Sequence, residues 1–248
     1  MISLLLGFGK KQKSKTMHKL AIFVEGQTEQ IFIKQLLYQI FGYQSIRVAD
    51  EKVIGRNIFI QLQDDAQEDH LKYLFLLVNV GNDEKVASAM LENASNMVSK
   101  GFKKILGLRD LYPHRREQET SIRNAINKVI QKSPESEKLK IFLAIMETEA
   151  WFLADTNLFE KIDKRLTQEY IREQLRYDLE QEDPESTLNH PAKIINDIYS
   201  LVDLSYKKRQ GDCYKIAHNI DYDYLYLDVR EQNKISSFFQ FADELTLI

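Results

Sequence analysis

The sequence predicts an α/β protein in which a mostly parallel sheet carries helices on both faces, followed by a helical C-terminal region. Short apolar runs of strand length alternate along the first part of the chain with segments of helical periodicity. Several of these runs are apolar throughout, which is typical of parallel strands buried on both faces. The 248 residues are 44% hydrophobic and 29% charged, which is enough apolar material for a sizeable core.

The individual elements follow from these patterns in chain order. Strands are predicted at 19–24, 58–62, 73–80, 102–108 and 139–146, and helices at 31–41, 86–98 and 122–130. Thr28 is expected to cap the first helix, which should end at Gly42. Residues 43–70 are polar and weakly patterned, so the strand at 58–62 is the one element expected there, followed by an acidic loop.

The character of the chain changes after Asp155, where strand-like runs give way to helical patterns at 170–179, 191–202 and 235–245. The predicted organisation is a flexible N-terminal extension (1–17), an α/β domain (18–155) and a helical C-terminal region (156–248) packed on it. The N-terminal apolar run precedes its lysines, unlike a secretory signal, and no later run reaches the length of a membrane span. A cytoplasmic protein with no membrane contact is therefore expected.

Composition excludes several functional classes. The chain has 34 Lys and Arg against 37 Asp and Glu, a net charge of -3, so a nucleic acid would need a locally basic surface or a metal ion. One cysteine, Cys213, excludes an intramolecular disulfide, and five dispersed histidines argue against a histidine-built zinc site. No G-x-x-x-x-G-K-[ST] loop for ATP is present.

Acidic residues follow three of the predicted strands. Glu25 follows the first, Asp110 follows the strand at 102–108, and Glu147 and Glu149 follow the strand at 139–146. The carboxyl ends of parallel strands form the crevice in which ligands bind, so these acids are expected to converge there. Carboxylates suit Mg²⁺ or Mn²⁺, which bridge to substrate phosphates. Acids after strands also cap helices or face water, and spacing alone leaves that alternative open.

These segments also resemble a known family. The hexapeptide at 24–29, VEGQTE, looks like the V-E-G-x-T-E opening of Toprim-like proteins, a fold shared by topoisomerases, bacterial primases and the overcoming-lysogenization-defect nucleases. The segments RDLYP (109–113) and IMETEAWFLAD (145–155) resemble the D-x-Y-x-x-P and H-E-F-E-A-L-L-F-S-D signatures of a bacterial Toprim-like family of unknown function. The resemblance covers residues 18–155 well and the remainder faintly, and it implies a Toprim-like fold.

The resemblance implies roles for individual residues. Glu25 matches the Toprim glutamate, which binds metal or acts as general acid or base, and Asp110 matches the first aspartate of the Toprim D-x-D pair. Tyr112 stands where the second aspartate would be, so Glu147 or Glu149 would have to complete the metal ligands. Catalysis is thus assigned to Glu25 and Asp110, and metal binding to these two with Glu147 and Glu149.

Further residues are candidates for supporting roles. Glu29 and Tyr112 are candidates for hydrogen bonding to the metal ligands and so keeping them in position. For Glu29, stabilisation by the dipole of the helix explains its presence in the first turn equally well. Candidate phosphate contacts are Arg115, Arg116, Lys207 and Arg209, and solvated surface charge is the alternative for the Lys207–Gly211 stretch. Trp151 is expected in the core rather than as a base-stacking platform.

Two functional hypotheses follow. The first is a Mg²⁺- or Mn²⁺-dependent phosphodiesterase, a nuclease acting on DNA or RNA. The resemblance further implies a role in anti-phage defence beside a separate ATPase. The alternative is a non-catalytic Toprim-like module that binds a nucleotide, nucleic acid or the partner ATPase, which the missing second aspartate favours. The sequence leaves the choice of DNA or RNA open, and also whether the chain forms a homo-oligomer.

Overall fold

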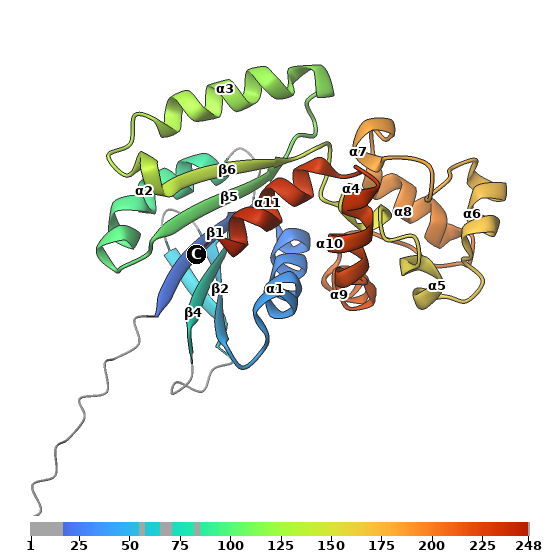
Figure 1. Ribbon diagram of the computed structural model, residues 1–248, viewed down its shortest axis with the longest axis horizontal. Coiled ribbons are helices and arrows are strands. Elements are labelled where there is room, and N and C mark those ends of the chain that lie inside the picture. The colour runs from blue at the N-terminus through green and yellow to red at the C-terminus, as the bar shows by residue number, and fades with distance from the viewer. Residues whose placement is uncertain (1–16, 55–57, 65–70, 82–84, 248) are drawn as a thin grey trace, which may run out of the picture.

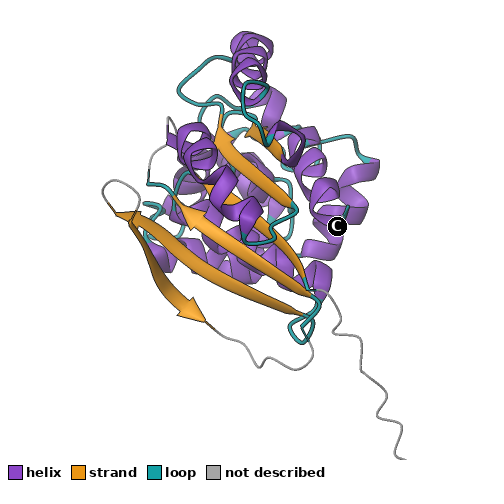
Figure 2. Cartoon of the chain, turned by 90° about the vertical axis from the view of Figure 1, so that its left-hand side faces the viewer, coloured by secondary structure: helices purple, strands orange, loops and turns teal. Residues whose placement is uncertain are grey.

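The computed structural model describes residues 17–54, 58–64, 71–81 and 85–247, and shows a six-stranded sheet with helices on both faces and a helical region beyond one end (Figure 1). The strands are β1 (His18–Val24), β2 (Ile46–Ile54), β3 (Ile58–Asp64), β4 (Tyr73–Asn79), β5 (Lys104–Asp110) and β6 (Leu139–Ala144). Their order is β3-β2-β4-β1-β5-β6. All neighbouring strands run parallel except β3, which pairs antiparallel with β2 at one edge (Figure 2).

Helices cover both faces of the sheet because alternate strand residues point to opposite sides. In β1, Ile22 packs on the side of α1 (Gln27–Phe41), whereas Phe23 packs with Met90 of α2 (Val86–Ser99). Helix α3 (Glu119–Ile130) lies on the α2 side against β6, and α11 (Ser236–Thr246) covers β6 on the α1 side. The sheet is therefore buried on both faces, as its apolar strands require.

Gly107 allows this close packing in the middle of β5. A Cβ atom on Gly107 would lie 2.9 Å from Cγ1 of Ile141 in β6 and 3.1 Å from Cγ1 of Val86 in α2. Real Cβ contacts do not come that close to a buried neighbour without displacing it. A residue without a side chain is therefore required where α2 crosses β5 and β6.

The helical region follows β6 directly. Its remaining helices are α4 (Glu149–Leu153), α5 (Leu158–Ile162), α6 (Gln168–Leu175), α7 (Pro184–Thr187), α8 (Pro191–Ser200), α9 (Gln210–Asn219) and α10 (Tyr222–Glu231). Short 3-10 turns occupy Arg116–Gln118 and Ser136–Lys138. One apolar core joins this region to the sheet: the ring of Phe32 in α1 lies 5.9 Å from that of Trp151 in α4 and 6.2 Å from that of Phe238 in α11.

The structure confirms the predicted fold class, an α/β sheet with helices on both faces and a helical C-terminal region. It also corrects several elements. Strand β2 was not expected, because three consecutive charged residues, Asp50, Glu51 and Lys52, interrupt its apolar pattern. Helix α6 ends at Leu175, because Arg176 takes a left-handed conformation with φ 56°. Trp151 is fully buried, as expected.

Other expectations about single elements also needed correction. Thr28 does not cap α1, which begins at Gln27; its buried hydroxyl lies 3.3 Å from Sγ of Cys213 instead. Helices α9 and α10 were not predicted. The N-terminal extension up to residue 16 and the acidic segment at 65–70 lie outside the described residues. Within the described part of the chain, no helix has both the length and the apolar composition needed to cross a bilayer.

Candidate functional site

The connections of the sheet place Glu25 and Asp110 beside each other. The chain leaves β1 toward β2 on one side and leaves β5 toward β6 on the other, so the carboxyl ends of β1 and β5 flank a topological switch point. Glu25 follows the last residue of β1, and Asp110 is the last residue of β5. The backbone N–H of Asp110 donates a 3.1 Å hydrogen bond to Oε2 of Glu25. The two predicted catalytic acids therefore meet at the place where open α/β sheets bind ligands.

Asp110 is held by Thr148, which follows β6. Both the backbone N–H and the hydroxyl of Thr148 donate to Oδ1 of Asp110, each at 2.9 Å. Asp110 and Thr148 are both buried. Two hydrogen bonds on one oxygen fix the orientation of the carboxylate and leave Oδ2 for other partners.

The backbone conformation of Met146 sets the direction of the chain that carries the acids after β6. Met146 has φ 66°, a conformation that is uncommon for a residue with a side chain and that turns the chain sharply between β6 and α4. Glu147 and Glu149 follow this turn. Oε2 of Glu147 accepts the backbone N–H of Ala192 in the first turn of α8 at 3.0 Å, and Oε1 of Glu149 accepts the hydroxyl of Tyr206 at 2.8 Å.

Lys208 joins these two carboxylates. Its Nζ lies 3.1 Å from Oε1 of Glu147 and 3.1 Å from the carboxylate of Glu149. Lys208 also has a left-handed backbone, with φ 53°, and its side chain is 39% exposed. Burial would lower the pKa of its ammonium, but the charges of Glu149, Asp110 and Glu147 outweigh burial and raise that pKa. Lys208 is therefore fully protonated and faces the acids from the mouth of the site.

Glu29 completes a group of five acids, here called the acidic cluster: Glu25, Glu29, Asp110, Glu147 and Glu149. Glu29 lies in the first turn of α1, where its Oε2 accepts the N–H of Gly26 at 2.8 Å. Burial and the charge of Glu149 raise the pKa of Glu29. Burial, followed by the charges of Glu29, Glu25 and Glu149, raises the pKa of Asp110 well above its ordinary value. The cluster therefore holds more negative charge than Lys208 neutralises.

The donor chemistry of the acidic cluster fits Mg²⁺ or Mn²⁺. Both ions prefer carboxylate oxygens, and a divalent cation would offset the repulsion that raises the pKa of Asp110. In the described residues, no three His, Cys, Asp or Glu side chains are arranged to hold a metal ion. The positive charge that holds Glu147 and Glu149 in the structure comes from Lys208. A cation would have to share these carboxylates with the ammonium.

The other predicted site residues lie at the margin. Tyr112 is 40% exposed, and its ring meets that of His190 edge-on at 5.3 Å. Arg115 is exposed, whereas the guanidinium of Arg116 donates to the carbonyls of Glu185 and Leu188 and to Oδ1 of Asn189 at 2.8 Å, so it fixes the chain after α7.

The two candidate phosphate contacts on either side of Lys208 are exposed. Lys207 and Arg209 both donate their backbone N–H to Oδ2 of Asp212, at 2.9 and 3.2 Å, which fixes the start of α9. Nothing in the structure gives either side chain a partner in the acidic cluster.

Three residues of the site were not identified from the sequence. These are Thr148, Tyr206 and Lys208, of which Lys208 is the one that faces the acids. Thr148 lies between two predicted metal ligands, so its position was a usable signal. Lys208 belongs to the basic stretch noted in the sequence, but nothing in that stretch distinguishes it from its neighbours. Tyr206 has no signal in the sequence, because its contact with Glu149 depends on the path of the chain between α8 and α9.

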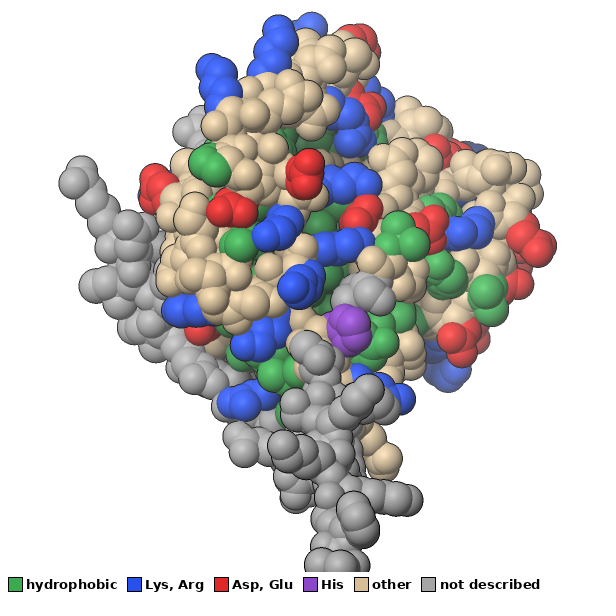
Figure 3. Space-filling view, turned by 60° about the vertical axis from the view of Figure 1, so that its left-hand side comes forward, with side chains coloured by type: hydrophobic (Ala, Val, Ile, Leu, Met, Phe, Trp, Pro, Cys, Tyr) green, Lys and Arg blue, Asp and Glu red, His purple; other side chains and the backbone are tan. Residues whose placement is uncertain are grey.

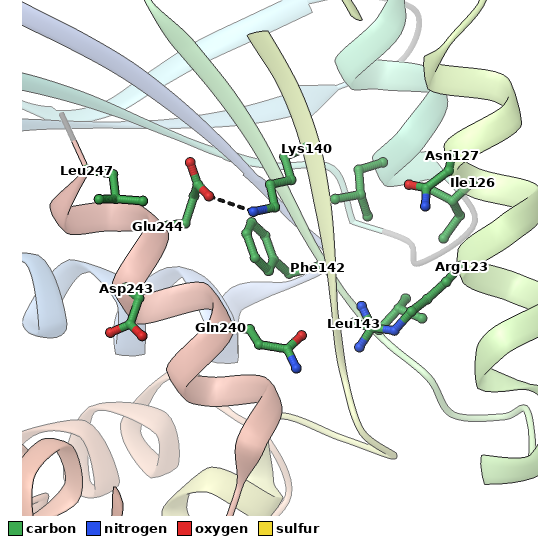
Figure 4. Close-up of a pocket in the computed structure, with 11 residues that line it drawn as sticks. Arg123, Ile126, Asn127, Lys140, Phe142, Leu143, Gln240, Asp243, Glu244 and Leu247 are labelled. Carbon is green, nitrogen blue, oxygen red and sulfur yellow. Dashed lines mark hydrogen bonds and ion pairs between the residues drawn. The ribbon is translucent and has the colours of Figure 1, made fainter. Parts of the chain in front are cut away.

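A separate cavity of about 360 Å³ lies between α3, β6 and α11 (Figure 4). It contains none of the acidic cluster. Its main polar feature is the ion pair of Lys140 with Glu244, at 2.6 Å. Toward the ends where β5 and β6 begin, Lys and Arg side chains form a band down the middle of the surface, with Asp and Glu among and beside them (Figure 3). Basic and acidic side chains are thus interspersed on this side of the molecule.

Comparison with known proteins gives a family. No curated protein matches the chain. Two structures of the C-terminal region of the OLD protein from Xanthomonas campestris pv. campestris are similar to it at 14% identity. One covers 92% of this chain and 96% of its own with a TM-score of 0.38, and the other covers 87% and 97% with a TM-score of 0.31. Similarity this weak carries no functional argument.

The family model described as "Domain of unknown function (DUF4276)" matches residues 24–236. The match begins at Val24, the first residue of the VEGQTE segment, and runs through the acidic cluster and Lys208 into the start of α11. It includes most of the sheet and nearly all of the helical region. The chain therefore belongs to the DUF4276 family.

Proposed function

We propose that the protein is a divalent-metal-dependent phosphodiesterase, a nuclease acting on DNA or RNA. One observation carries the proposal: carboxylates from the ends of β1, β5 and β6 and from the first turn of α1 gather at the switch point of the sheet, where Lys208 pairs with Glu147 and Glu149. Burying so many like charges destabilises a fold, and proteins keep such arrangements where function requires them. The support comes from this geometry, together with the Toprim-like segments in the sequence.

The residues that would hold Mg²⁺ or Mn²⁺ are Glu25 and Asp110, with Glu147 and Glu149. When bound, such an ion lowers the pKa of water and neutralises charge on a phosphate. The chain supplies the rest. Thr148 keeps the Asp110 carboxylate oriented, and Lys208, at the mouth of the cluster, is placed to neutralise a phosphate oxygen.

The partners and the biological role are part of the same proposal. A nuclease with an acidic catalytic cluster needs its substrate held by other surfaces, because the cluster repels a polyanion. A separate ATPase partner, a role in anti-phage defence and cytoplasmic location follow from the resemblance stated above and rest on it alone.

A second candidate function is a non-catalytic module that binds a nucleotide, a nucleic acid or the partner ATPase. Two observations favour it. Tyr112 occupies the place of a second aspartate. Lys208 also already bridges Glu147 and Glu149, as it would in an ion-pair network that needs no metal.

Calorimetric titration of Mn²⁺ distinguishes the two. Saturable binding by the wild type that is lost in the double variant Glu25→Gln/Asp110→Asn supports a metal site in the acidic cluster. Asp197→Asn is the matched control, because Asp197 lies on the exposed side of α8 and pairs with Lys193 at 2.5 Å. Cleavage of labelled DNA and RNA in Mg²⁺ or Mn²⁺ should follow the same pattern. Cleavage that survives in the double variant would contradict the catalytic assignment.

If the wild type binds no Mn²⁺ and cleaves neither DNA nor RNA, the phosphodiesterase proposal fails and the binding module remains. If it binds Mn²⁺ in the acidic cluster without cleaving either, the metal site stands and its catalytic role does not.

A further inference from the structure

Two cavities of about 300 and 350 Å³ adjoin each other along α1. They share three lining residues, Lys34, Gln35 and Tyr214, so they form one continuous groove between α1, β2 and α9. Helix α9 packs beside α1 (Figure 1). We call this feature the α1 groove.

One stripe of α1 forms the floor of the groove. Gln27, Gln30, Lys34 and Tyr38 recur at three- and four-residue intervals and so lie on one face of the helix. From Gln27 to Tyr38 the stripe is about 16 Å long at the rise of an α-helix. That length accommodates several nucleotides, which are spaced about 3.4 Å apart along a stacked strand.

One end of the groove is lined by residues that flank the site in the sequence, although none of the five acids lines either cavity. Gln27 lies two residues after Glu25, and Gln210 lies two residues after Lys208. Both glutamines line the end of the groove nearest to the first turns of α1 and α9. A chain lying in the groove would therefore have one end near the first turn of α1, which follows Glu25 and carries Glu29.

The side chains along the groove are of the kinds that bind unpaired bases. The ring of Tyr43 stacks on that of Tyr38 at 4.3 Å with an interplanar angle of 12°, and Tyr43 remains 62% exposed. Tyr214, which borders both cavities, is 39% exposed. Exposed tyrosine rings are stacking platforms for bases. The exposed amides of Gln27 and Gln210 can donate to and accept from base edges, whereas the amide of Gln30 is already bonded within the protein.

The charge of the groove suits a polyanion better than that of the acidic cluster does. Asp50 is the one acid among the described residues that line it, and Lys34 neutralises Asp50 at 2.6 Å. Arg47 borders the far end of the groove but also lines the cavity on the α2 side of the sheet with Met97. The phosphates of a strand would thus meet little repulsion until they reach the acidic cluster.

We propose that the α1 groove binds a single strand of nucleic acid and leads it to the acidic cluster, with Tyr43 and Tyr214 stacking on its bases. This inference rests on the proposed phosphodiesterase function, and it narrows the substrate class to single strands. A duplex has its bases already stacked on each other, so it cannot use the tyrosines.

The test is fluorescence anisotropy with labelled 12-nucleotide DNA and RNA strands and with a hairpin duplex of the same DNA sequence. It uses wild type and the Glu25→Gln variant, both in Mg²⁺, so that binding is measured with and without cleavage. We expect tighter binding of the single strands than of the hairpin. Tyr43→Ala/Tyr214→Ala should weaken single-strand binding at least about fivefold.

Two controls separate stacking from folding. Tyr43→Phe/Tyr214→Phe keeps both rings and should bind as wild type does. Tyr170→Ala removes a partly buried tyrosine from α6, outside the groove, and should also leave binding unchanged. Thermal unfolding of each variant shows that the fold is retained.

Equal binding by wild type and Tyr43→Ala/Tyr214→Ala would overturn the groove assignment, as would preference for the hairpin or absence of single-strand binding. Single-strand binding that depends on both rings but leads to no cleavage would support the groove while the phosphodiesterase proposal fails. Cleavage of duplex that is unaffected by the tyrosine variants would leave the phosphodiesterase proposal and overturn the groove.

Discussion

Thr148 gives both of its donors to a single oxygen of Asp110, from the turn that connects β6 to α4. Asp110 ends β5 and Thr148 follows β6, and these two parallel strands are neighbours whose carboxyl ends lie side by side. The relationship fixes Asp110 in one orientation and ties the position of the β6 turn to that of the acidic cluster. Substituting Thr148 therefore tests directly whether the acidic cluster is arranged to bind a ligand.

Thr148→Val keeps the shape of the side chain and removes the hydroxyl. Partners that orient metal ligands typically contribute 10- to 100-fold to metal affinity or activity, so we expect Mn²⁺ affinity to fall by about 10-fold or more. Thr148→Ser retains the hydroxyl and should stay near wild type. Calorimetric titration measures both. Equal Mn²⁺ affinity in the valine and serine variants would show that the hydroxyl does not position Asp110 for a metal.

Asp110→Asn should make the metal-free protein more stable at neutral pH. The pKa of Asp110 is raised by burial and by Glu29, Glu25 and Glu149, so ionising this group destabilises the fold. A raised carboxyl pKa contributes stability below the unfolded value of 3.8, and that stability is lost as the pH rises through the folded pKa. Asparagine can still accept from Thr148.

The measurement is the midpoint of thermal unfolding of both proteins across a pH series. Each 1 kcal/mol of stabilisation corresponds to about 2–4 °C for a protein of this size. The advantage of Asp110→Asn should shrink as the pH falls toward 3.8. A variant that is less stable than wild type at neutral pH would mean that the carboxylate is satisfied by its partners.

Lys208→Met removes the ammonium from Glu147 and Glu149 but keeps a side chain of similar length. The unpaired carboxylates should lower stability without metal and should bind Mn²⁺ more tightly, because the ion no longer competes with the ammonium. Phosphodiesterase activity should nevertheless fall, since no group then faces the substrate phosphate. Lys128→Met, at an exposed position on α3 outside the acidic cluster, is the control for stability, Mn²⁺ binding and activity. Weaker Mn²⁺ binding by Lys208→Met would contradict the competition.

Glu244 provides a pH test away from the acidic cluster. Burial would raise its pKa, but the ammonium groups of Lys104 and Lys140, both at 2.6 Å, outweigh burial and lower it. A lowered carboxyl pKa contributes stability above the unfolded value of 4.5, and that stability is lost as the pH falls through the folded pKa. Glu244→Gln should therefore unfold at a lower temperature than wild type at about pH 7. A gap that stays constant down to strongly acidic pH would exclude the ion pairs as its cause.

Gly107→Ala should destabilise the protein by about 1–3 kcal/mol, because its methyl group would overlap Ile141 and Val86. Gly211 is the matched control: nothing lies within 4 Å of a Cβ there, and it stands in helix α9. Gly211→Ala should instead stabilise the protein by up to about 1 kcal/mol. Urea unfolding of the two variants measures both effects. Equal effects of the two substitutions would mean that packing at Gly107 is not tight.

The sequence predicted those parts of the fold in which local pattern and burial agree. The apolar runs of β1, β4, β5 and β6 are buried on both faces, so their composition alone identified them. Strand β2 escaped prediction because it lies near the edge of the sheet and carries charged residues such as Asp50 between its apolar ones. Its strand character depends on pairing with β4, which no local pattern shows.

The residues of the candidate site also divide into those that the sequence predicted and those that it could not. Glu25, Asp110, Glu147 and Glu149 could be predicted to converge, because parallel strands bring their carboxyl ends to one edge. Lys208 and Tyr206 could not, since they reach the acids through the segment between α8 and α9, whose path is set by tertiary packing. Whether these residues bind metal remains a prediction for the titrations above.

The shared core also has a consequence for synthesis of the protein. Trp151 packs against Phe238 and Phe241 of α11, and Phe142 of β6 lies 5.5 Å from Phe241. A growing chain on the ribosome therefore exposes these rings until the last helix has emerged from the exit tunnel. The residues that face the acids are also made long after the strands that carry them. Assembly of the acidic cluster is thus expected only after α11 has been translated.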